Sequence, residues 1–178
     1  MENILYTKLA NFYDLVADDR DFSYECSKMI HLYQVLNKNQ KPRNMLELFA
    51  GPAYHAQVFK ENYQIDAYAV DNSPQMKALA CSKHNIDEGK YIRGLLPDIL
   101  STPALQQPFD LILIMRYSLG LIDHKAAHDL LNQLENHMTP GGLVIIELHH
   151  LNAFINQFAD LTIKTRQKYY PETKQTIA

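Results

Sequence analysis

The chain has 178 residues, of which 47% are hydrophobic, 21% charged and 10% aromatic. This composition is that of an ordinary globular protein of one domain, and it excludes disordered, collagen-like and low-complexity chains. The net charge of -3 and the two cysteines disfavour general binding to nucleic acid and exclude a disulfide framework or a four-thiolate zinc site. No apolar run reaches the roughly 18–20 residues that cross a bilayer, and the N-terminus does not resemble a signal peptide. We therefore expect a cytoplasmic protein without a membrane interaction.

Residues 1–43 are expected to form an N-terminal helical cap. Apolar residues recur at helical spacing between Tyr6 and Ala17, which predicts a helix with an apolar face. That face would carry Leu9, Phe12, Tyr13 and Val16. A second helix is expected to end near Leu36, before a polar segment at 37–42.

Residues 44–150 alternate between short apolar runs and helical patterns. Strands are expected at 44–49, 65–70, 90–96, 109–115 and 143–148, with helices at 53–63, after Ser73 and after Asp123. The segment 139–142 (TPGG) is expected to end the last of these helices. This alternation predicts an α/β fold, with a doubly wound, mostly parallel sheet that carries helices on both faces. Ligands of such sheets bind at the carboxyl ends of the strands.

The first of these strand ends reads ELFAGPA over residues 47–53, and Asp71 ends the second strand twenty residues after Gly51. Small residues let a backbone approach a ligand closely, and an acid at the end of the second strand can accept hydrogen bonds from both ribose hydroxyls. A generic strand-to-helix turn and an Asp in an Asx turn are the alternatives for these two features.

The chemistry of this turn limits which nucleotide it can hold. A dinucleotide needs several backbone N–H groups around its pyrophosphate, whereas this loop has one glycine and Pro52 lacks an N–H. A nucleoside or dinucleotide oxidoreductase is therefore a weak alternative, and no triphosphate-binding G-x-x-x-x-G-K-[ST] motif occurs.

Four segments resemble motifs of the class I S-adenosylmethionine-dependent methyltransferases, in the right order. Residues 47–53 resemble the family's D-x-G-x-G-x-G turn, and 71–76 (DNSPQM) its D-x-S-x-x-M segment. Residues 109–113 (FDLIL) and 140–143 (PGGL) are similar to its fourth strand and to the turn before its fifth. The opening helix resembles the Y-D-containing helix of the small-molecule branch. The resemblance implies a Rossmann-like core at 44–150 within a single domain, 1–178.

The resemblance also implies roles for individual residues in binding S-adenosyl-L-methionine. Glu47 and the turn would hold its methionine end, the Met115 carbonyl its ammonium group and Asp71 its ribose, while Tyr13 would close over the site. The implied cofactor-binding residues are Tyr13, Glu47, Phe49, Ala50, Gly51, Pro52, Asp71, Asn72, Met76, Leu96 and Met115.

The chain departs from the family pattern at two places in the core. Phe49 and Ala53 stand where the family has its outer glycines, so the turn is expected to sit differently or to be partly plugged. Residues 94–96 (GLL) replace the usual G-D-M, and Asp98 is a weak substitute for the missing acid.

The C-terminal part, 151–178, resembles an incomplete substrate-side hairpin. One strand within 162–170, a turn at 171–174 and a second strand to Ile177 are expected, whereas the family completes its sheet with two further strands. Either the chain is truncated or a partner completes the sheet, so we expect a homo-oligomer or a heteromeric partner.

Two residues are candidate catalytic bases: His149 first, because it follows the fifth strand and imidazole titrates near neutral pH, and then Tyr117. A surface role is the alternative for both, and for His150. Arg116 would pair either with a substrate carboxylate or with a structural partner. His124 and His128 have the spacing of metal ligands but lack a third ligand, so they are assigned to a solvated helix face and no metal is expected.

These patterns predict methyl transfer from S-adenosyl-L-methionine to a small-molecule or natural-product acceptor, by the chain alone or within a complex. The alternative is a catalytically degenerate subunit that binds or scaffolds a partner chain.

Overall fold

The computed structural model describes residues 4–17, 20–150, 168–170 and 175–177. The chain divides into two compact units, Met1–Leu148 and His149–Ala178. The helices of the first unit are η1 (Ile4–Tyr6), α1 (Ala10–Ala17), α2 (Phe22–Leu36), α3 (Tyr54–Tyr63), α4 (Pro74–Lys83), η2 (Glu88–Lys90), η3 (Asp98–Ser101), η4 (Pro103–Leu105), η5 (Ser118–Leu121), α5 (His124–Leu134) and η6 (Glu135–His137). Its strands are β1 (Asn44–Leu48), β2 (Asp66–Asp71), β3 (Tyr91–Arg93), β4 (Phe109–Ile114) and β5 (Met138–Ile146).

The five strands form one parallel sheet in the order β3-β2-β1-β4-β5. The order reverses between β1 and β4, so the carboxyl ends of these two central strands flank the crevice where such sheets bind ligands. All six residues of β4 are buried, as are four of the five in β1, which explains their almost continuous apolar sequences. The predicted doubly wound α/β fold is confirmed.

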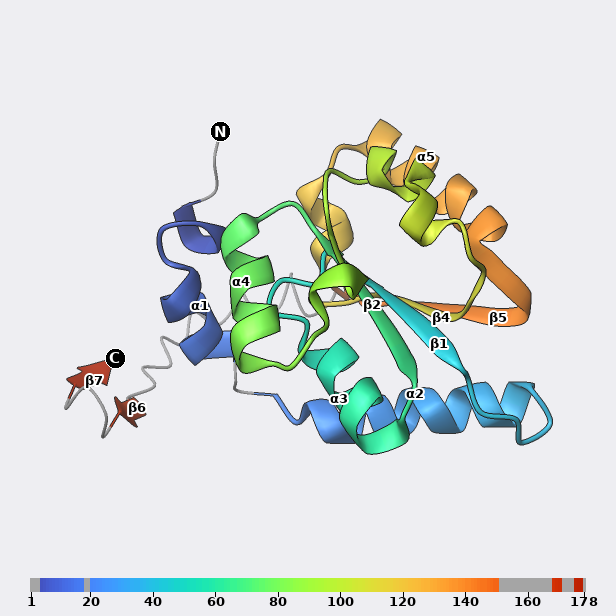
Figure 1. Ribbon diagram of the computed structural model, residues 1–178, viewed down its shortest axis with the longest axis horizontal. Coiled ribbons are helices and arrows are strands. Elements are labelled where there is room, and N and C mark those ends of the chain that lie inside the picture. The colour runs from blue at the N-terminus through green and yellow to red at the C-terminus, as the bar shows by residue number, and fades with distance from the viewer. Residues whose placement is uncertain (1–3, 18–19, 151–167, 171–174, 178) are drawn as a thin grey trace. The chain divides into compact units, whose positions relative to one another are not determined.

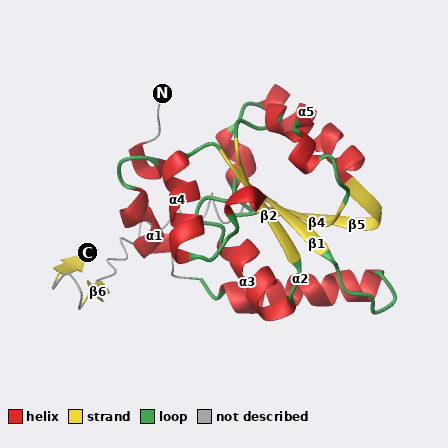
Figure 2. Cartoon of the chain, in the orientation of Figure 1, coloured by secondary structure: helices red, strands yellow, loops and turns green. Residues whose placement is uncertain are grey.

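Helices cover both faces of this sheet (Figures 1 and 2). On one face, side chains of α2, α3 and α4 pack against the strands around Met45, Phe59 and Leu111. On the other, α5 packs through Leu130 and Leu134. A smaller cluster joins α1 to α4 through Ala10, Met76 and Leu79.

Two of the expected helix starts are present. The Ser73 hydroxyl accepts a hydrogen bond from the Met76 backbone N–H, with Pro74 in the first turn of α4. The Asp123 carboxylate accepts one from the Ala126 N–H at the start of α5. Side-chain oxygens at these positions satisfy backbone donors that a helix leaves open, which fixes where each helix begins.

Two details differ from the sequence prediction. The buried residues of α1 are Ala10, Asp14 and Ala17, whereas Leu9, Phe12 and Val16 are exposed, so the predicted apolar face is wrong. The segment 139–142 does not separate a helix from a strand, because it lies inside β5, which already pairs with Phe109 at Met138. The register shifts between Phe109 and Leu111, and this irregularity accommodates the extra residues.

In the second unit, β6 (Lys168–Tyr170) pairs antiparallel with β7 (Gln175–Ile177), with Lys168 opposite Ile177. This is the pairing expected of the predicted hairpin, whose turn at 171–174 lies outside the described residues. Within the described part of the chain, no helix combines the length and the apolar character that a membrane span requires.

Candidate functional site

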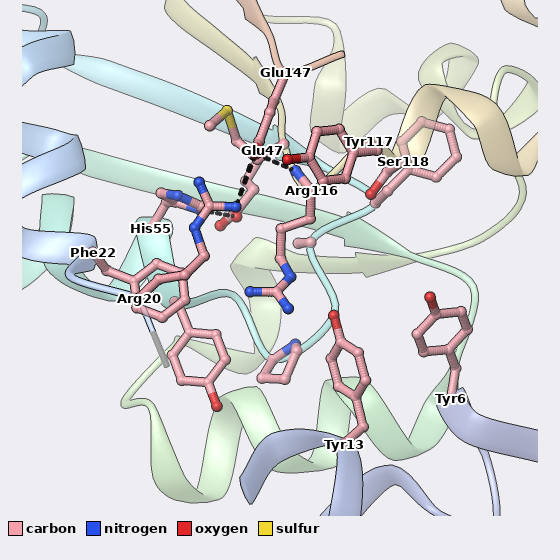
Figure 3. Close-up of a pocket in the computed structure, with 15 residues that line it drawn as sticks. Tyr6, Tyr13, Arg20, Phe22, Glu47, His55, Arg116, Tyr117, Ser118 and Glu147 are labelled. Atoms are coloured by element: carbon pink, nitrogen blue, oxygen red, sulfur yellow. Dashed lines mark hydrogen bonds and ion pairs between the residues drawn. The ribbon is translucent and has the colours of Figure 1, made fainter. Parts of the chain in front are cut away.

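A cavity of about 490 Å³ opens at the carboxyl ends of β1, β4 and β5. Its size is that of a small-molecule site. Aromatic rings from α1, α2 and the strand ends surround a group of charged side chains (Figure 3). The lining residues are Tyr6, Tyr13, Arg20, Phe22, Glu47, Phe49, Ala50, Pro52, Tyr54, His55, Met115, Arg116, Tyr117, Ser118 and Glu147.

The turn after β1 has left-handed backbone at three alternate residues. Phe49 has φ 54°, Gly51 φ 53° and Ala53 φ 63°. Glycine adopts this conformation freely, whereas a residue with a Cβ is strained by about 1–2 kcal/mol. Phe49 and Ala53 are thus held in a conformation that glycine adopts freely, and the expectation that these substitutions change how the turn sits or partly plug it stays a prediction.

Side chains from the neighbouring strands hold Gly51 in place. Its N–H donates to Asp71 Oδ2 at 3.0 Å, and its carbonyl accepts from the Tyr91 hydroxyl at 2.6 Å. The other oxygen of Asp71 accepts from the Ser73 N–H at 2.9 Å, which is the Asx turn considered as the alternative for this residue. Burial raises the pKa of Asp71, and its hydrogen bonds to backbone N–H groups partly offset that effect.

A chain of ion pairs runs along the wall of the cavity from β1 to the residue that follows β5. The buried Glu47 bonds His55 Nδ1 at 2.7 Å, and His55 Nε2 bonds Glu25 at 3.0 Å. Arg20 links Glu25 at 2.6 Å to Glu147 at 3.0 Å. Figure 3 shows Arg20, Glu47, His55 and Glu147 of this ion chain converging on one side of the cavity. The ion chain ties the N-terminal cap to the sheet.

His55 is the most deeply buried member of this ion chain, with 1% of its side chain exposed. Burial alone would lower the pKa of His55, but the carboxylates of Glu47 and Glu25 outweigh it and raise the pKa to about 9. The ring is therefore a cation at neutral pH and donates from both nitrogens. Glu47 uses its second oxygen to accept the Ala56 N–H at 3.0 Å, so both of its oxygens have partners.

Asp14 and Tyr13, which are neighbours in α1, make different contacts. Asp14 is buried and accepts hydrogen bonds from the Tyr54 hydroxyl at 2.8 Å, His84 Nε2 at 2.9 Å and Lys83 Nζ at 3.2 Å. Burial by itself would raise the pKa of Asp14, yet these donors lower it. Tyr13 points the other way and covers the turn after β1, since a Cβ added to Gly51 would lie 3.9 Å from its Cε1.

The segment after β4 is also strained. Arg116 and Tyr117 both have left-handed backbone, with φ 55° and 59°, and neither is a glycine. The Arg116 N–H donates to Glu147 Oε2 at 2.7 Å, which holds the turn. Figure 3 shows the Arg116 guanidinium projecting across the cavity toward Tyr13. Its Cζ lies 5.9 Å from the centroid of the Tyr13 ring.

Seven of the thirteen predicted site residues line the cavity: Tyr13, Glu47, Phe49, Ala50, Pro52, Met115 and Tyr117. Gly51 lies in the same turn and contacts Asp71, which is not among the lining residues. The other positions are diverse: Asn72 is exposed, Met76 is fully buried against α1, and Leu96 packs against the core on the α5 face. His149 is exposed and belongs to the second unit, so its role stays a prediction.

The ion chain is the part of the site that the sequence did not predict. Arg20 and Glu147 are 127 residues apart, and His55 and Glu25 are 30 apart, so no local spacing signals these pairs. One signal was present: Glu147 follows β5 at the sheet edge where ligands were expected. His55 follows the turn directly and carries no motif.

Comparison with models of protein families shows which family this fold and its site belong to. A family model described as a methyltransferase domain matches residues 45–142, from β1 into β5. The chain belongs to this methyltransferase family. The match confirms the resemblance to class I enzymes that the four motifs indicated, and comparison with curated proteins gives no significant match.

Solved methyltransferases share the fold at low sequence identity. The plantazolicin methyltransferase BpumL, in complex with a substrate analogue and SAH, has 19% identity and a TM-score of 0.68 over 88% of this chain and 58% of its own. A SAM-bound amino pentose methyltransferase from Micromonospora echinaspora has 16% identity and a TM-score of 0.62 over 84% and 59%. A S-adenosylmethionine-dependent methyltransferase from Clostridium acetobutylicum has 20% identity and a TM-score of 0.61 over 92% and 63%. This chain thus spans about three fifths of their length.

The turn after β1 can be set beside the family motif position by position. The positions with left-handed backbone, 49, 51 and 53, are those where the family motif carries its three glycines. The acid that opens the motif is present as Glu47 and is buried under the turn. The turn therefore has left-handed backbone at all three motif positions, although only Gly51 is a glycine.

Proposed function

We propose that the chain binds S-adenosyl-L-methionine and transfers its methyl group to a small-molecule acceptor of the natural-product type. Family membership supports the reaction class, and the SAM- and SAH-bound structures with the same fold support the cofactor. One observation carries the proposal: the Gly51 N–H bonds the Asp71 carboxylate in a turn that keeps left-handed backbone at 49, 51 and 53. This bond joins the two sequence features that suit an adenosine ligand without phosphates: the turn after β1 and the acid that ends β2.

Two groups of residues at the sheet edge would bind the two parts of the cofactor, its methionine end and its adenosine. The cavity residues Tyr13, Glu47, Phe49, Ala50, Pro52 and Met115 would hold its methionine end, with Gly51 in the same turn. Asp71 would accept the ribose hydroxyls, because its carboxylate has lone-pair capacity beyond that used by the backbone N–H groups of Gly51, Ser73 and Asn72. Asn72, Met76 and Leu96 are assigned to the adenine side by resemblance, and the buried position of Met76 means that α1 would have to shift for it to touch a ligand.

The chain's residues would contribute alignment more than covalent chemistry. The cofactor supplies an electrophilic methyl group, so the C–S bond breaks as the bond from the acceptor atom to carbon forms. The aromatic walls of the cavity exclude water and orient the acceptor, an effect of several kcal/mol in well-aligned reactions. If the acceptor atom carries a proton, Tyr117, which lines the cavity, or His149 would accept it.

A catalytically degenerate binding or scaffolding subunit is the second candidate. Two observations favour it: the ring of Tyr13 covers Gly51, and the Phe49 side chain lines the cavity while packing against the core. In this alternative the aromatic rings fill the space that a cofactor would take.

A partner chain is also part of the proposal. Among the described strands, β5 is one of the two edges of the sheet, with β4 as its neighbour, and its residues 143–146 are half-exposed although apolar. Such an edge favours pairing with another strand, so we propose a homo-oligomer or a heteromeric partner that completes the sheet. Light scattering during size-exclusion chromatography measures the assembly directly, and a monomeric chain would contradict this part.

Calorimetric titration of the whole chain with SAM and SAH tests the transferase proposal. Saturable binding of both is the expected result. No binding by the chain, alone or together with a protein that co-purifies with it, would leave only the scaffolding function.

A further inference from the structure

Arg116 is a cation that the strained turn after β4 directs into the cavity. Its left-handed backbone and that of Tyr117 are conformations that side chains with a Cβ disfavour, and such strain persists where the surroundings enforce it. Here the bond from the Arg116 N–H to Glu147 enforces it. The guanidinium contacts the Ala17 carbonyl at 3.4 Å and faces the Tyr13 ring.

The other charges around the cavity are already paired. Arg20 lies between Glu25 and Glu147, and the His55 cation lies between Glu25 and Glu47. Within the described ranges 4–17 and 20–150, no carboxylate lies within ion-pair distance of the Arg116 guanidinium. The half-buried guanidinium contacts only neutral groups, the Ala17 carbonyl and the Tyr13 side chain, within these ranges, so several of its five N–H donors stay available for a ligand.

We propose that Arg116 is the residue that selects a carboxylate in this cavity. A guanidinium presents two parallel N–H groups that match the two oxygens of a carboxylate. A dianionic phosphate would suit this site less well, because Glu47 and Glu147 line the same cavity. The turn after β1 is also poor in open N–H groups, since Pro52 has none and Gly51 donates to Asp71.

This inference rests on the proposed methyl transfer and names the ligand group that the site recognises. The carboxylate has two possible sources, which share the same chemistry: the amino-acid end of the cofactor, and an acceptor that is itself a carboxylic acid. The two sources make different predictions for one variant, Arg116→Gln.

The cofactor arm compares SAM with decarboxylated SAM by calorimetry, because the two differ only in the carboxylate. If the cofactor is the source, Arg116→Gln weakens SAM binding at least tenfold and changes the binding of the decarboxylated analogue less than twofold. Binding of the analogue also shows that the variant is folded. Arg116→Lys, which keeps the charge but loses the paired donors, should retain part of the affinity.

The acceptor arm uses the SAH-saturated protein with benzoate and its neutral counterpart benzamide as probes. If the acceptor is the source, the wild type prefers benzoate at least tenfold, Arg116→Gln loses this preference, and its affinity for SAM is unchanged. Lys125→Gln, which removes a cation from the exposed surface of α5, is the matched control and should change neither arm.

The outcomes separate this inference from the proposed function. A carboxylate-specific loss in either arm supports it and identifies the source. If the wild type binds both cofactor forms and Arg116→Gln changes no carboxylate ligand more than its neutral partner, the inference is overturned and the transferase proposal stands. If the wild type binds neither cofactor form, both are overturned.

Discussion

The backbone N–H of Gly51 and the carboxylate of Asp71 are joined by a 3.0 Å hydrogen bond across the ends of β1 and β2. The bond fixes the orientation of the half-buried Asp71 carboxylate at the edge of the sheet. The directions in which it can accept further hydrogen bonds are therefore also fixed. The same carboxylate also begins the turn into α4 through Ser73. Asp71 is therefore both a structural residue of the turn and the proposed ribose ligand.

Asp71→Ala is expected to weaken binding of SAH by about 1–3 kcal/mol, roughly 5- to 150-fold, because two hydrogen bonds to the ribose would be lost. Calorimetric titration measures this change. Asp66→Ala is the control, since Asp66 lies at the opposite end of β2 and pairs with Lys90. That variant should bind SAH like the wild type, and an unchanged affinity for Asp71→Ala would contradict the ribose role.

Replacing Ala53 by glycine should stabilise the protein, although glycine usually destabilises. Ala53 is fully buried with φ 63°, so removal of its Cβ relieves strain that exceeds the entropic cost of glycine, and we expect a gain of about 0.5–1 kcal/mol. Urea unfolding measures the free energy. Ala56→Gly is the matched control, because Ala56 is equally buried but lies inside α3, where the same change should destabilise by about 1 kcal/mol. A loss in both variants would show that Ala53 is unstrained.

The order of elements was predictable because it depends on local patterns. Short, nearly continuous apolar runs such as residues 109–114 favour buried strands by their length, and the capping oxygens of Ser73 and Asp123 mark helix starts within a few residues of chain. The motif acid Glu47 and the lone glycine of the turn could likewise be placed at the sheet edge.

The backbone of the turn after β1 and the orientation of α1 could not be predicted, because both depend on packing between segments that are distant in the sequence. Phe49 and Ala53 disfavour left-handed backbone, so their conformation is imposed by the strands and helices around the turn and contradicts their own preferences. The orientation of α1 follows from Asp14, whose partners on α3 and at the end of α4 outweigh the apolar residues on its opposite face. A pattern of apolar spacing carries no information about such polar contacts.

Asp14→Ala is expected to loosen α1 from the core. The change leaves the Tyr54 hydroxyl, Lys83 and His84 without their shared acceptor, which should cost about 1–3 kcal/mol. Hydrogen exchange of the amides in residues 10–17 should accelerate in the variant, and urea unfolding gives the energy. Asp129→Ala, at a half-exposed position of α5 away from α1, should alter neither measurement. Unchanged protection of α1 in Asp14→Ala would show that the helix is held by its apolar contacts alone.

The buried ion chain predicts a stability that falls with rising pH through His55. The pKa of His55 is raised from about 6.5 in the unfolded chain to about 9, because Glu47 and Glu25 outweigh its burial. The stabilisation is therefore fully present below pH 6.5, decreases as the pH rises, and is lost once the pH passes about 9. Burial also raises the pKa of Cys26 and Tyr91, so these groups contribute to the loss of stability at alkaline pH as well. The contribution of His55 is therefore measured as the difference between the wild type and a variant that lacks the imidazole.

We expect the free energy of unfolding of the wild type to exceed that of His55→Gln by a few kcal/mol at pH 6 and by much less at pH 10. His31→Gln, on the exposed face of α2, should follow the wild type throughout. Parallel curves for the wild type and His55→Gln would mean that the imidazole is neutral between its two carboxylates.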